Sequence, residues 1–385
     1  MEIEKITGRI AQDLEYLKKF TATPGEGCTR LPFTKEARDA VNYLRETMEE
    51  IGLEVHEDEA GNVFGILRGT DPEAPCVMSG SHYDSVIHGG NYDGIGGVVC
   101  SIEMARQIAE SGMEHKRDLV VVGFNDEEGM RFGTGYFGSG AMLGHRDEAY
   151  TEQFKDANGI SIAEAMKEYG LDPAKVGDAA WKEGSIGHFV EAHIEQGPVL
   201  DQKKLEVGLV TGIVGIQRYM VTVHGRADHA GTTPMDMRMD AVDTASKVIC
   251  KIADWAREKA DGTVATVGFM NVTPGGMNIV AEKVEFTVDI RSMNNDNIND
   301  IARRIRAALE RECKIMGGSF EIDTKLVIEP VALDAGHTGR FLQGERILLH
   351  ASSEWCGTRL SGNRSAASNS YAVRFQQGRS KPCTG

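Results

Sequence analysis

Residues 76–97 read CVMSGSHYDSVIHGGNYDGIGG, and residues 118–129 read DLVVVGFNDEEG. Each stretch opens with an apolar run of strand length and passes into a segment that carries His, Asp or Glu. The glycine-rich turn at the end of the first stretch opens a helix near residues 94–112, so strand, helix and strand follow one another. This alternation predicts an α/β domain with a mostly parallel, mixed sheet.

A second pattern begins near residue 211. Its expected elements are a strand at 218–224, a helix at about 238–260, strand-like runs at 264–271 and 279–290, a helix at about 295–315 and a strand at 319–328. Their β-α-β-β-α-β order is the ferredoxin-like arrangement and predicts an inserted domain. The expected boundaries are 1–210 for the first part of the main domain, 211–327 for the inserted domain and 328–385 for the return to the main domain.

The composition limits the possible partners and compartment. The chain has 385 residues, which exceeds the usual size of a single hydrophobic core. A net charge of −16 without a lysine-rich block argues against nucleic acid or an anionic membrane as a partner. Seven scattered cysteines without a C-x-x-C pair indicate a reducing compartment, so we expect a cytoplasmic protein. We expect no signal peptide and no membrane span, because no stretch approaches about 18 apolar residues.

A histidine and two aspartates follow the first apolar run. His82 and Asp84 stand at its end, and Asp93 lies beside the glycine-rich turn. Ligands gather at the carboxyl ends of parallel strands, so this pattern suits a metal site. A His-x-Asp pattern is weak by itself, and a solvated loop is the alternative interpretation.

The second apolar run ends in the acidic segment Asn125-Asp126-Glu127-Glu128. Solvated turn charges are one interpretation of this cluster. The functional interpretation divides the glutamate pair, so that one binds metal and its neighbour acts as a general base whose pKa the cations tune.

Three further segments carry candidate residues. His193-Ile-Glu195-Gln196 follows another strand-like run, although a histidine between apolar neighbours is more often structural than a ligand. His229 lies in a glycine-bearing loop between strand and helix, where it could present a donor to a substrate. Arg291 ends a long strand, and its guanidinium suits a substrate carboxylate in bidentate fashion, with a surface ion pair as the alternative.

Taken together, these segments resemble the N-carbamoyl-L-amino-acid hydrolase and allantoate amidohydrolase family, part of the wider dinuclear group of aminoacylases and carboxypeptidases. The resemblance runs through residues 1–334, and His-Ile-Glu-Gln-Gly-Pro points to the carbamoylase branch. The segments that carry it are Gly80–Asp84, Asn91–Gly97, Glu127–Gly144, His193–Leu200, Thr211–Gly215, Asp228–Asp240 and Asp289–Ser292.

The resemblance implies two divalent metal ions, of Zn, Mn, Co or Ni. Glu127 would be the general base that activates a water, and Asp84 would orient His82. His82 and His193 would hold one ion, Asp93 would bridge to the second, and Glu128 would bind that second ion. The implied metal ligands are thus His82, Asp93, Glu128 and His193.

The resemblance also implies substrate residues and a partner. Gln196, Asn278 and Arg291 would bind a small substrate, with Arg291 on its carboxylate. His229 would reach the neighbouring subunit's site and polarise the scissile carbonyl. Members of the family are typically homodimers through the inserted domain, which serves as a lid and dimerisation domain.

The tail departs from the family pattern. The family supplies a last metal ligand from a His-Ser-Pro-like motif and a substrate loop, Ser-Gly-Ala-Gly-His-Asp, and neither occurs after Asp334. Residues 335–385 hold seven Lys or Arg against two acids, unlike the acidic remainder. Codons exist for which Ser353–Leu360, read one nucleotide later, gives Ser-Gly-Ala-Gly-His-Asp, and Val373–Gly385 gives a segment with His-Ala-Pro that is close to the terminal motif, in family order. We therefore predict that 335–385 is frame-shifted, and a divergent genuine tail is the alternative.

The sequence thus predicts metal-dependent hydrolysis of a carbamoyl or ureido C–N bond in an N-carbamoyl-L-amino acid or allantoate, impaired here by loss of the C-terminal His ligand. One alternative is an aminoacylase-like or dipeptidase-like hydrolase of the wider group. Another is a catalytically silent relative that binds amino-acid-like ligands or dimerises with intact copies.

Overall fold

The computed structural model describes residues 2–333, 349–354 and 371–377. It divides into two compact units. The N-terminal unit runs to Val210 and takes up the chain again after the second unit, which we call the inserted unit and which spans Thr211–Ala332. Each unit has its own hydrophobic core.

The larger sheet has the order β1-β2-β4-β3-β5-β14-β6-β12, and β13 (Leu349–Glu354) also pairs with β6. Its pairs β4–β3, β3–β5 and β14–β6 are parallel, whereas β1–β2, β2–β4, β5–β14 and β6–β12 are antiparallel. The predicted α/β class with a mixed sheet is confirmed, and the parallel strands occupy its centre. The strands are β1 (Glu54–Glu57), β2 (Val63–Leu67), β3 (Cys76–His82), β4 (Leu119–Phe124), β5 (Ile186–Ile194), β6 (Val207–Ile213) and β14 (Tyr371–Gln377).

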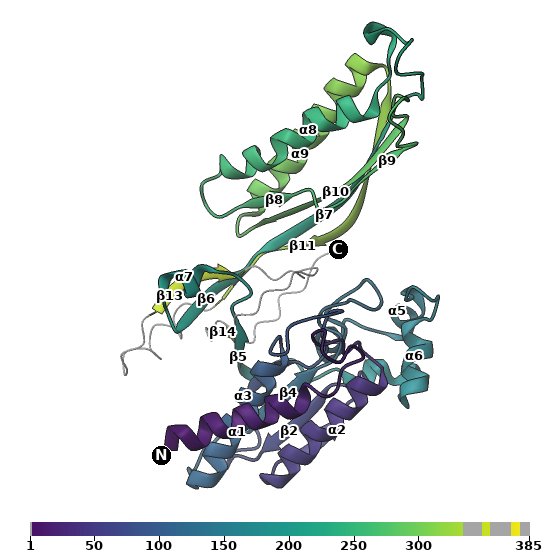
Figure 1. Cartoon of the computed structure of the whole chain (residues 1–385). Helices are drawn as coiled ribbons and strands as arrows, with labels where there is room; N and C mark the ends of the chain where they lie inside the picture. Colours follow the sequence, from purple (N-terminus) through teal and green to yellow (C-terminus); the bar gives the residue numbers. More distant parts are fainter. Residues whose placement is uncertain (1, 334–348, 355–370, 378–385) are drawn as a thin grey trace. The chain divides into compact units, whose positions relative to one another are not determined.

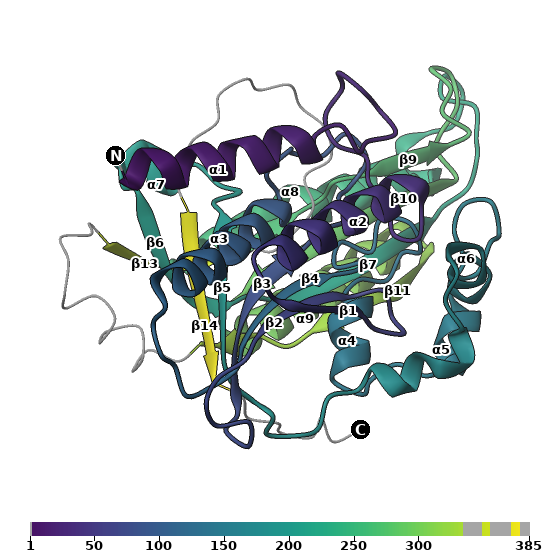
Figure 2. The ribbon, with the colours of Figure 1, turned by 90° about the horizontal axis from the view of Figure 1, so that it is seen from below.

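Helices cover both faces of this sheet because alternate residues of β4 are apolar on both sides. Val121 faces a core with α1, α2 and α3, which lie together over one face (Figure 2). Val120 and Val122 face a second core with Met142 of α4. The helices of this unit are α1 (Glu2–Leu17), α2 (Lys35–Glu50), α3 (Ile95–Ser111), α4 (Phe137–Met142), α5 (Glu148–Gln153), α6 (Ile162–Tyr169), η1 (Pro173–Ala179) and α7 (Val199–Lys203).

The inserted unit is a five-stranded antiparallel sheet with two helices on one face (Figure 1). The strand order is β11-β7-β10-β8, with β9 also paired to β10. Its elements are β7 (Gly215–His224), η2 (Met235–Met237), α8 (Ala241–Arg257), β8 (Val264–Thr266), β9 (Met270–Thr273), β10 (Lys283–Ser292), α9 (Asn295–Met316), β11 (Ser319–Ile328) and β12 (Val331–Ala332).

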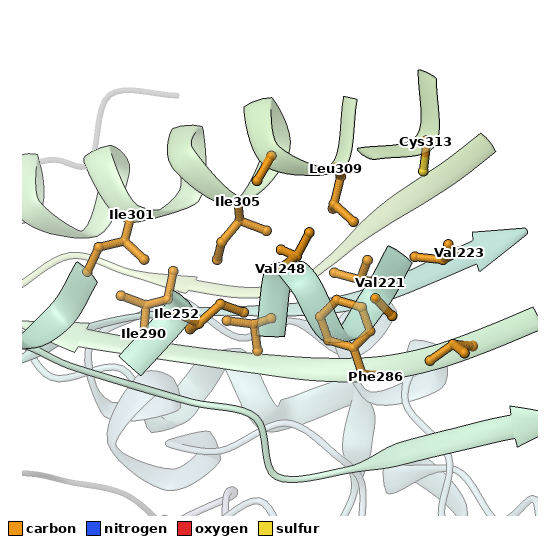
Figure 3. Close-up of a cluster of buried hydrophobic side chains, with 14 of the residues drawn as sticks. Val221, Val223, Val248, Ile252, Phe286, Ile290, Ile301, Ile305, Leu309 and Cys313 are labelled. Atoms are coloured by element: carbon orange, nitrogen blue, oxygen red, sulfur yellow. The ribbon is translucent and has the colours of Figure 1, made fainter. Parts of the chain in front are cut away.

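The core of the inserted unit follows from the strict alternation of β10. Every second residue of this strand is buried, and Phe286 and Ile290 point toward Ile252 of α8 and Ile305 of α9 (Figure 3). The other face of β10 carries polar, half-buried side chains. One predicted strand differs, because the run at 264–271 forms two short strands, β8 and β9, that pair with β10 on either side of an interruption at Gly268.

Among the described residues, the helices are all too short or too polar to cross a membrane. The tail contributes the backbone of β13 (Leu349–Glu354) and of β14, which pairs antiparallel with β5. Residues 334–348, 355–370 and 378–385 lie outside the described part of the chain. Most of the segment predicted to be frame-shifted is among them, so that prediction stays a prediction.

Candidate metal centre and substrate residues

Three neighbouring strands carry the candidate ligands to one edge of the sheet. His82 is the last residue of β3, His193 lies near the end of β5, and Glu127 and Glu128 lie in the turn after β4. Because β4, β3 and β5 are parallel, their carboxyl ends meet at the same edge. Asp93 reaches this edge from the turn before α3. The structure therefore brings all of the predicted metal ligands together.

The two histidines face one carboxylate oxygen. The Nε2 atoms of His82 and His193 lie 3.9 and 3.4 Å from Oδ1 of Asp93. The Nδ1 atom of His82 contacts the carbonyl of Asp84 at 3.0 Å, and Nδ1 of His193 contacts the carbonyl of Ile194 at 2.9 Å. A carbonyl only accepts, so each Nδ1 carries the proton and donates it. Each Nε2 lone pair is then directed toward Asp93, as a metal ligand requires.

The surroundings of Asp93 fit a cation. Its Oδ1 atom is buried and has no hydrogen-bond partner among the described residues. A buried carboxylate oxygen without a donor is costly unless an ion neutralises it. His82, Asp93 and His193 each offer a ligand atom within 4.8 Å of the others, and they combine nitrogen and oxygen donors. This donor set suits borderline divalent metals such as zinc.

The glutamate pair forms a second group that shares His82. Ligand atoms of His82, Glu127 and Glu128 lie within 4.8 Å of one another, with 3.9 Å between His82 Nε2 and Glu127 Oε2. Burial, together with the charges of Glu127 and Asp93, raises the pKa of Glu128 to about 8. Burial alone would lower the pKa of His82, but the surrounding carboxylates raise it well above its usual value. Both pKa shifts are upward, and together they indicate an excess of negative charge around the cluster that a divalent cation would relieve.

Asp84 holds the acidic turn as well as His82. Its buried carboxylate accepts hydrogen bonds from the backbone N–H groups of Glu127 at 3.0 Å and Glu128 at 3.2 Å. The carboxylate lies 3.5 Å from Nδ1 of His82, and the closer contact of that ring is with the Asp84 backbone carbonyl. Asp84 therefore links the β3 ligand to the β4 ligands.

Gln196 and Glu195 have different surroundings in the structure. The Gln196 side chain donates a 2.8 Å hydrogen bond to Oδ2 of Asp93, so this predicted substrate residue lies beside the metal cluster. Glu195 accepts from the backbone N–H groups of Val199 and Leu200 at 2.8 and 2.9 Å. Glu195 thus caps the start of α7 and takes no part in the cluster.

Glycine is required beside His82. A Cβ atom at Gly94 would lie 2.4 Å from the His82 ring, and the residue has φ +63°. Both the space and the backbone conformation exclude a larger side chain there. The glycine-rich turn therefore lets the imidazole lie against the start of α3.

Sequence reasoning did not identify the buried network behind the acidic turn. Asn62 is fully buried, accepts from the Asn125 backbone N–H at 3.0 Å and donates to Asp58 at 2.7 Å and to the Gly138 carbonyl at 3.0 Å. Asp126 was also not assigned a role, although it is buried with φ +51°. Burial and the charges of Asp84 and Glu127 raise its pKa well above its usual value. The adjacent Asn-Asp pair before the glutamates was the only sequence signal for these positions.

His229 and Asn278 lie together in the inserted unit. Both are exposed, and their loops are joined by an isolated bridge between His229 and Ile279 and by a 3.0 Å hydrogen bond from the Ala230 N–H to the Asn278 carbonyl. The structure therefore brings these two predicted substrate residues to one end of the five-stranded sheet.

Arg291 lies at the other end of that sheet. Lys283, at the start of β10, is the partner of His224, whereas Arg291 is the partner of Ile216. Eight residues of extended strand correspond to about 27 Å. Arg291 donates from Nε and Nη2 to the two oxygens of Asp289 at 2.7 and 3.0 Å, and Arg218 donates to the same carboxylate at 2.8 Å. Arg291 is therefore not brought next to His229 or Asn278 within one unit.

Comparison with known proteins gives one consistent family. The chain matches peptidase family M20/M25/M40 over residues 78–345. It is 43% identical over 306 residues to N-carbamoyl-L-amino acid amidohydrolase of Geobacillus stearothermophilus, covering 80% of this chain and 74% of that protein. It is 35% identical over 336 residues to allantoate amidohydrolase of Bacillus subtilis, covering 87% of this chain and 81% of that protein.

A solved structure agrees with these sequence relatives. A hydantoinase/carbamoylase family amidase from Burkholderia ambifaria aligns with a TM-score of 0.80 at 29% identity, over 91% of this chain and 85% of that chain. The predicted resemblance is confirmed, as is the assignment to hydrolases of non-peptide C–N bonds. The chain belongs to peptidase family M20/M25/M40, in its branch of metal-dependent N-carbamoyl-L-amino-acid and allantoate amidohydrolases.

Proposed function

We propose that this protein hydrolyses the carbamoyl or ureido C–N bond of an N-carbamoyl-L-amino acid or of allantoate, with two divalent metal ions. The observation that carries the proposal is a cluster in which the buried His82 and His193 meet the half-buried Asp93 and Glu128, with Glu127 beside it. The named activities of the relatives supply the substrate class.

Two ions fit the two ligand groups better than one. His82 with Asp93 and His193 forms one group, and Glu128 lies in the other. The family resemblance implies that Asp93 would bridge the two positions; its Oδ1 lies near both histidines, and its Oδ2 accepts a hydrogen bond from Gln196. The ions would supply Lewis-acid polarisation and charge neutralisation when bound, and Zn, Mn, Co or Ni suits the nitrogen and oxygen donors.

Glu127 is the residue that we assign to proton transfer. It lies in the turn after β4, and its Oε2 atom lies 3.9 Å from Nε2 of His82, which belongs to both ligand groups. It would take a proton from the attacking water while the water oxygen bonds to the carbonyl carbon, and would pass that proton to the departing nitrogen as the C–N bond breaks. Atoms balance with one water consumed, and an N-carbamoyl amino acid yields the amine and carbamic acid, which decomposes to ammonia and carbon dioxide.

The separation of substrate residues supports a homodimeric site. A small carboxylate-bearing substrate is far shorter than the ~27 Å between the two ends of β10. Arg291 at one end and His229 with Asn278 at the other would contact one substrate molecule only if two copies each supplied one end. Large apolar side chains exposed on the inserted unit agree with such pairing, since they are costly in water: Met235, Met237, Phe269, Met270 and Met277.

If residues 335–385 are frame-shifted, we expect the chain to be less active than its relatives. We propose that the family's last His ligand is lost from residues 335–385, so that the ion at Glu128 is bound more weakly than the ion at His82 and His193. Sequencing the coding DNA around codons 330–340 tests this directly. We call the protein with the alternative frame from about residue 335 the tail-restored protein.

A cytoplasmic location stays a prediction from the cysteine pattern.

A matched substrate panel tests the proposed function. Ammonia and amine release would be measured from N-carbamoyl-L-methionine, its D enantiomer, allantoate, 3-ureidopropionate, N-acetyl-L-methionine and a dipeptide, with the chain and the tail-restored protein. We expect turnover of an L-carbamoyl or ureido substrate and at most weak turnover of the acetyl and peptide compounds. Preferred cleavage of N-acetyl-L-methionine or the dipeptide would instead support an aminoacylase-like or dipeptidase-like enzyme.

A further inference from the structure

The loop of His229 contains a hydrogen bond that determines which ring nitrogen carries the proton. The backbone N–H of Gly231 donates to Nδ1 of His229 at 3.0 Å. A backbone N–H only donates, so Nδ1 must be the unprotonated nitrogen of the neutral ring. Nε2 then carries the hydrogen. Because His229 is exposed, this N–H is available to an acceptor outside the loop.

This tautomer is opposite to that of the two metal-cluster histidines. His82 and His193 donate from Nδ1 to backbone carbonyls and leave the Nε2 lone pair free. His229 accepts at Nδ1 and leaves an Nε2–H donor. The same residue type is therefore prepared as a ligand in one unit and as a hydrogen-bond donor in the other. A donor is what polarisation of a carbonyl oxygen requires.

Arg238 holds the loop in this conformation. Its Nη2 atom donates to the Ala230 carbonyl at 2.6 Å, and its Nε atom donates to the Thr233 carbonyl at 3.0 Å. These two carbonyls flank Gly231, so one planar guanidinium fixes the backbone on both sides of the N–H that sets the tautomer. The turn also closes on itself, because the N–H of Thr233 donates to the His229 carbonyl at 3.1 Å.

Gly231 leaves only limited room for the ring. A Cβ atom at this position would lie 3.2 Å from Cε1 and 3.5 Å from Nδ1 of His229. The imidazole therefore folds back directly over the residue whose N–H it accepts. Small movements of the backbone at Gly231 would lengthen the hydrogen bond and release the ring.

We propose that Arg238 is a positioning residue that, through Ala230, Thr233 and the Gly231 N–H, keeps His229 in the Nε2–H tautomer. The proposal rests on the proposed function, in which that N–H polarises the scissile carbonyl. Lysine cannot replace Arg238 fully, because a single ammonium lacks the planar fork that reaches two carbonyls in fixed directions.

The direct test reads the tautomer without any substrate. The full chain, labelled with ¹⁵N-histidine, would be studied at pH 8, above the ordinary imidazole pKa of about 6.5, by two-bond ¹H–¹⁵N NMR. His229→Ala assigns the resonance. We expect Nε2 to be protonated and Nδ1 unprotonated in the unaltered chain, and both tautomers to be populated in Arg238→Met. Arg304→Met is the matched control, since Arg304 pairs with Glu258 and Asp300 on the helices of the same unit.

The turnover of Arg238 variants gives a second test that is independent of the tautomer measurement. We expect Arg238→Ala in the full chain to lower kcat about 10- to 100-fold with a small change in KM, because a misplaced donor acts mainly on the transition state. Guanidinium at millimolar concentration should restore part of kcat and the single tautomer, whereas sodium chloride at equal ionic strength should not. An Nδ1–H tautomer in the unaltered chain, or one unchanged by Arg238→Met, would overturn the proposal. A tautomer that responds as expected in a protein that cleaves none of the substrates would leave this positioning intact and contradict the proposed function instead.

Discussion

We assign different roles to the two adjacent glutamates in the turn after β4: proton transfer to Glu127 and ion binding to Glu128. Glu127 and Glu128 both lie near His82, and their backbone N–H groups are both held by Asp84. Removing the charge of one should therefore leave the turn in place. This allows proton transfer and ion binding to be tested apart.

Glu127→Gln in the tail-restored protein should retain its metal and lose turnover. Glutamine keeps the shape but cannot accept a proton, and loss of a general base typically costs about 10²–10⁴-fold. Metal content by atomic spectroscopy and kcat would be measured together, with Glu195→Gln as the control because Glu195 only caps α7. Near-normal kcat with both ions bound would exclude Glu127 as the base.

Arg291→Lys should weaken the use of carboxylate-bearing substrates without changing metal content. Lysine keeps the charge but loses the fork that Asp289 now holds at Nε and Nη2. We expect kcat/KM to fall about 10-fold or more, by the discrimination that a charged hydrogen bond provides. Glu285→Gln is the control, since Glu285 is on the same face of β10 and pairs with Lys283. Unchanged kinetics would make Arg291 a structural residue.

At the scale of elements, the sequence predicted the strands that carry the ligands. It did not predict the buried hydrogen bonds that fix the turn after β4. The apolar runs before His82 and Glu127 were sufficient to predict β3 and β4, because a buried central strand must be apolar on both faces. The network of Asn62, Asp58 and Asn125 could not be predicted, since its partners are about 60 residues apart and meet only after β2 and β4 pair.

The neighbouring strands of the inserted unit show the same limit. The alternation of β10 predicted its buried face, yet nothing in the sequence distinguished Arg291 held by Asp289 from an arginine open to solvent. Likewise, His229 was recognised as a donor, whereas the N–H that fixes its tautomer depends on the folded turn at Gly231. Side-chain roles that arise from backbone geometry are therefore the part that sequence reasoning missed.

Asp58, in the turn between β1 and β2, should make the stability of the folded chain depend on pH. Burial, opposed in part by hydrogen bonds from Asn62 and Ala60, raises the pKa of Asp58 to about 7. Its ordinary pKa is about 3.9. A raised folded-state pKa favours the protonated form, so this group's contribution to stability is complete below about pH 4 and is lost as the pH rises through about 7.

Asp58→Asn should therefore flatten the pH dependence of unfolding. Between pH 4 and pH 8 we expect the unaltered chain to lose about 2–4 kcal/mol of stability that the variant does not lose. Urea unfolding at the two pH values measures this, with the exposed Asp178→Asn as the control. An equal pH dependence in the unaltered chain and Asp58→Asn would mean that Asp58 is charged in the folded protein at pH 4.

At the scale of the whole molecule, the proposed homodimeric site can be tested with mixed subunits. Glu127→Gln and His229→Ala should each be inactive alone. In a mixed dimer, the intact Glu127 of one copy can combine with the intact His229 of the other and restore one of two sites. Random exchange in an equal mixture should thus recover about a quarter of normal turnover, since half of the dimers are mixed.

The subunit-mixing measurement uses tail-restored proteins with two different affinity tags. Dimers that carry both tags would be isolated and assayed, and each variant mixed with itself is the control. Isolated mixed dimers without activity would show that His229 does not act across the interface. A protein that remains monomeric at assay concentration would contradict the shared site as well.

Removal and return of the metal ions show whether turnover depends on the cluster at His82, Asp93, His193 and Glu128. The tail-restored protein would be stripped with a chelator, and Zn²⁺ or Mn²⁺ would be returned stepwise while bound ions and N-carbamoyl-L-amino acid turnover are measured on the same samples. We predict that turnover disappears with the ions and returns as the second ion per subunit binds, and that His193→Ala does not recover. Undiminished turnover in a sample in which atomic spectroscopy detects no divalent metal would contradict the metal-dependent mechanism.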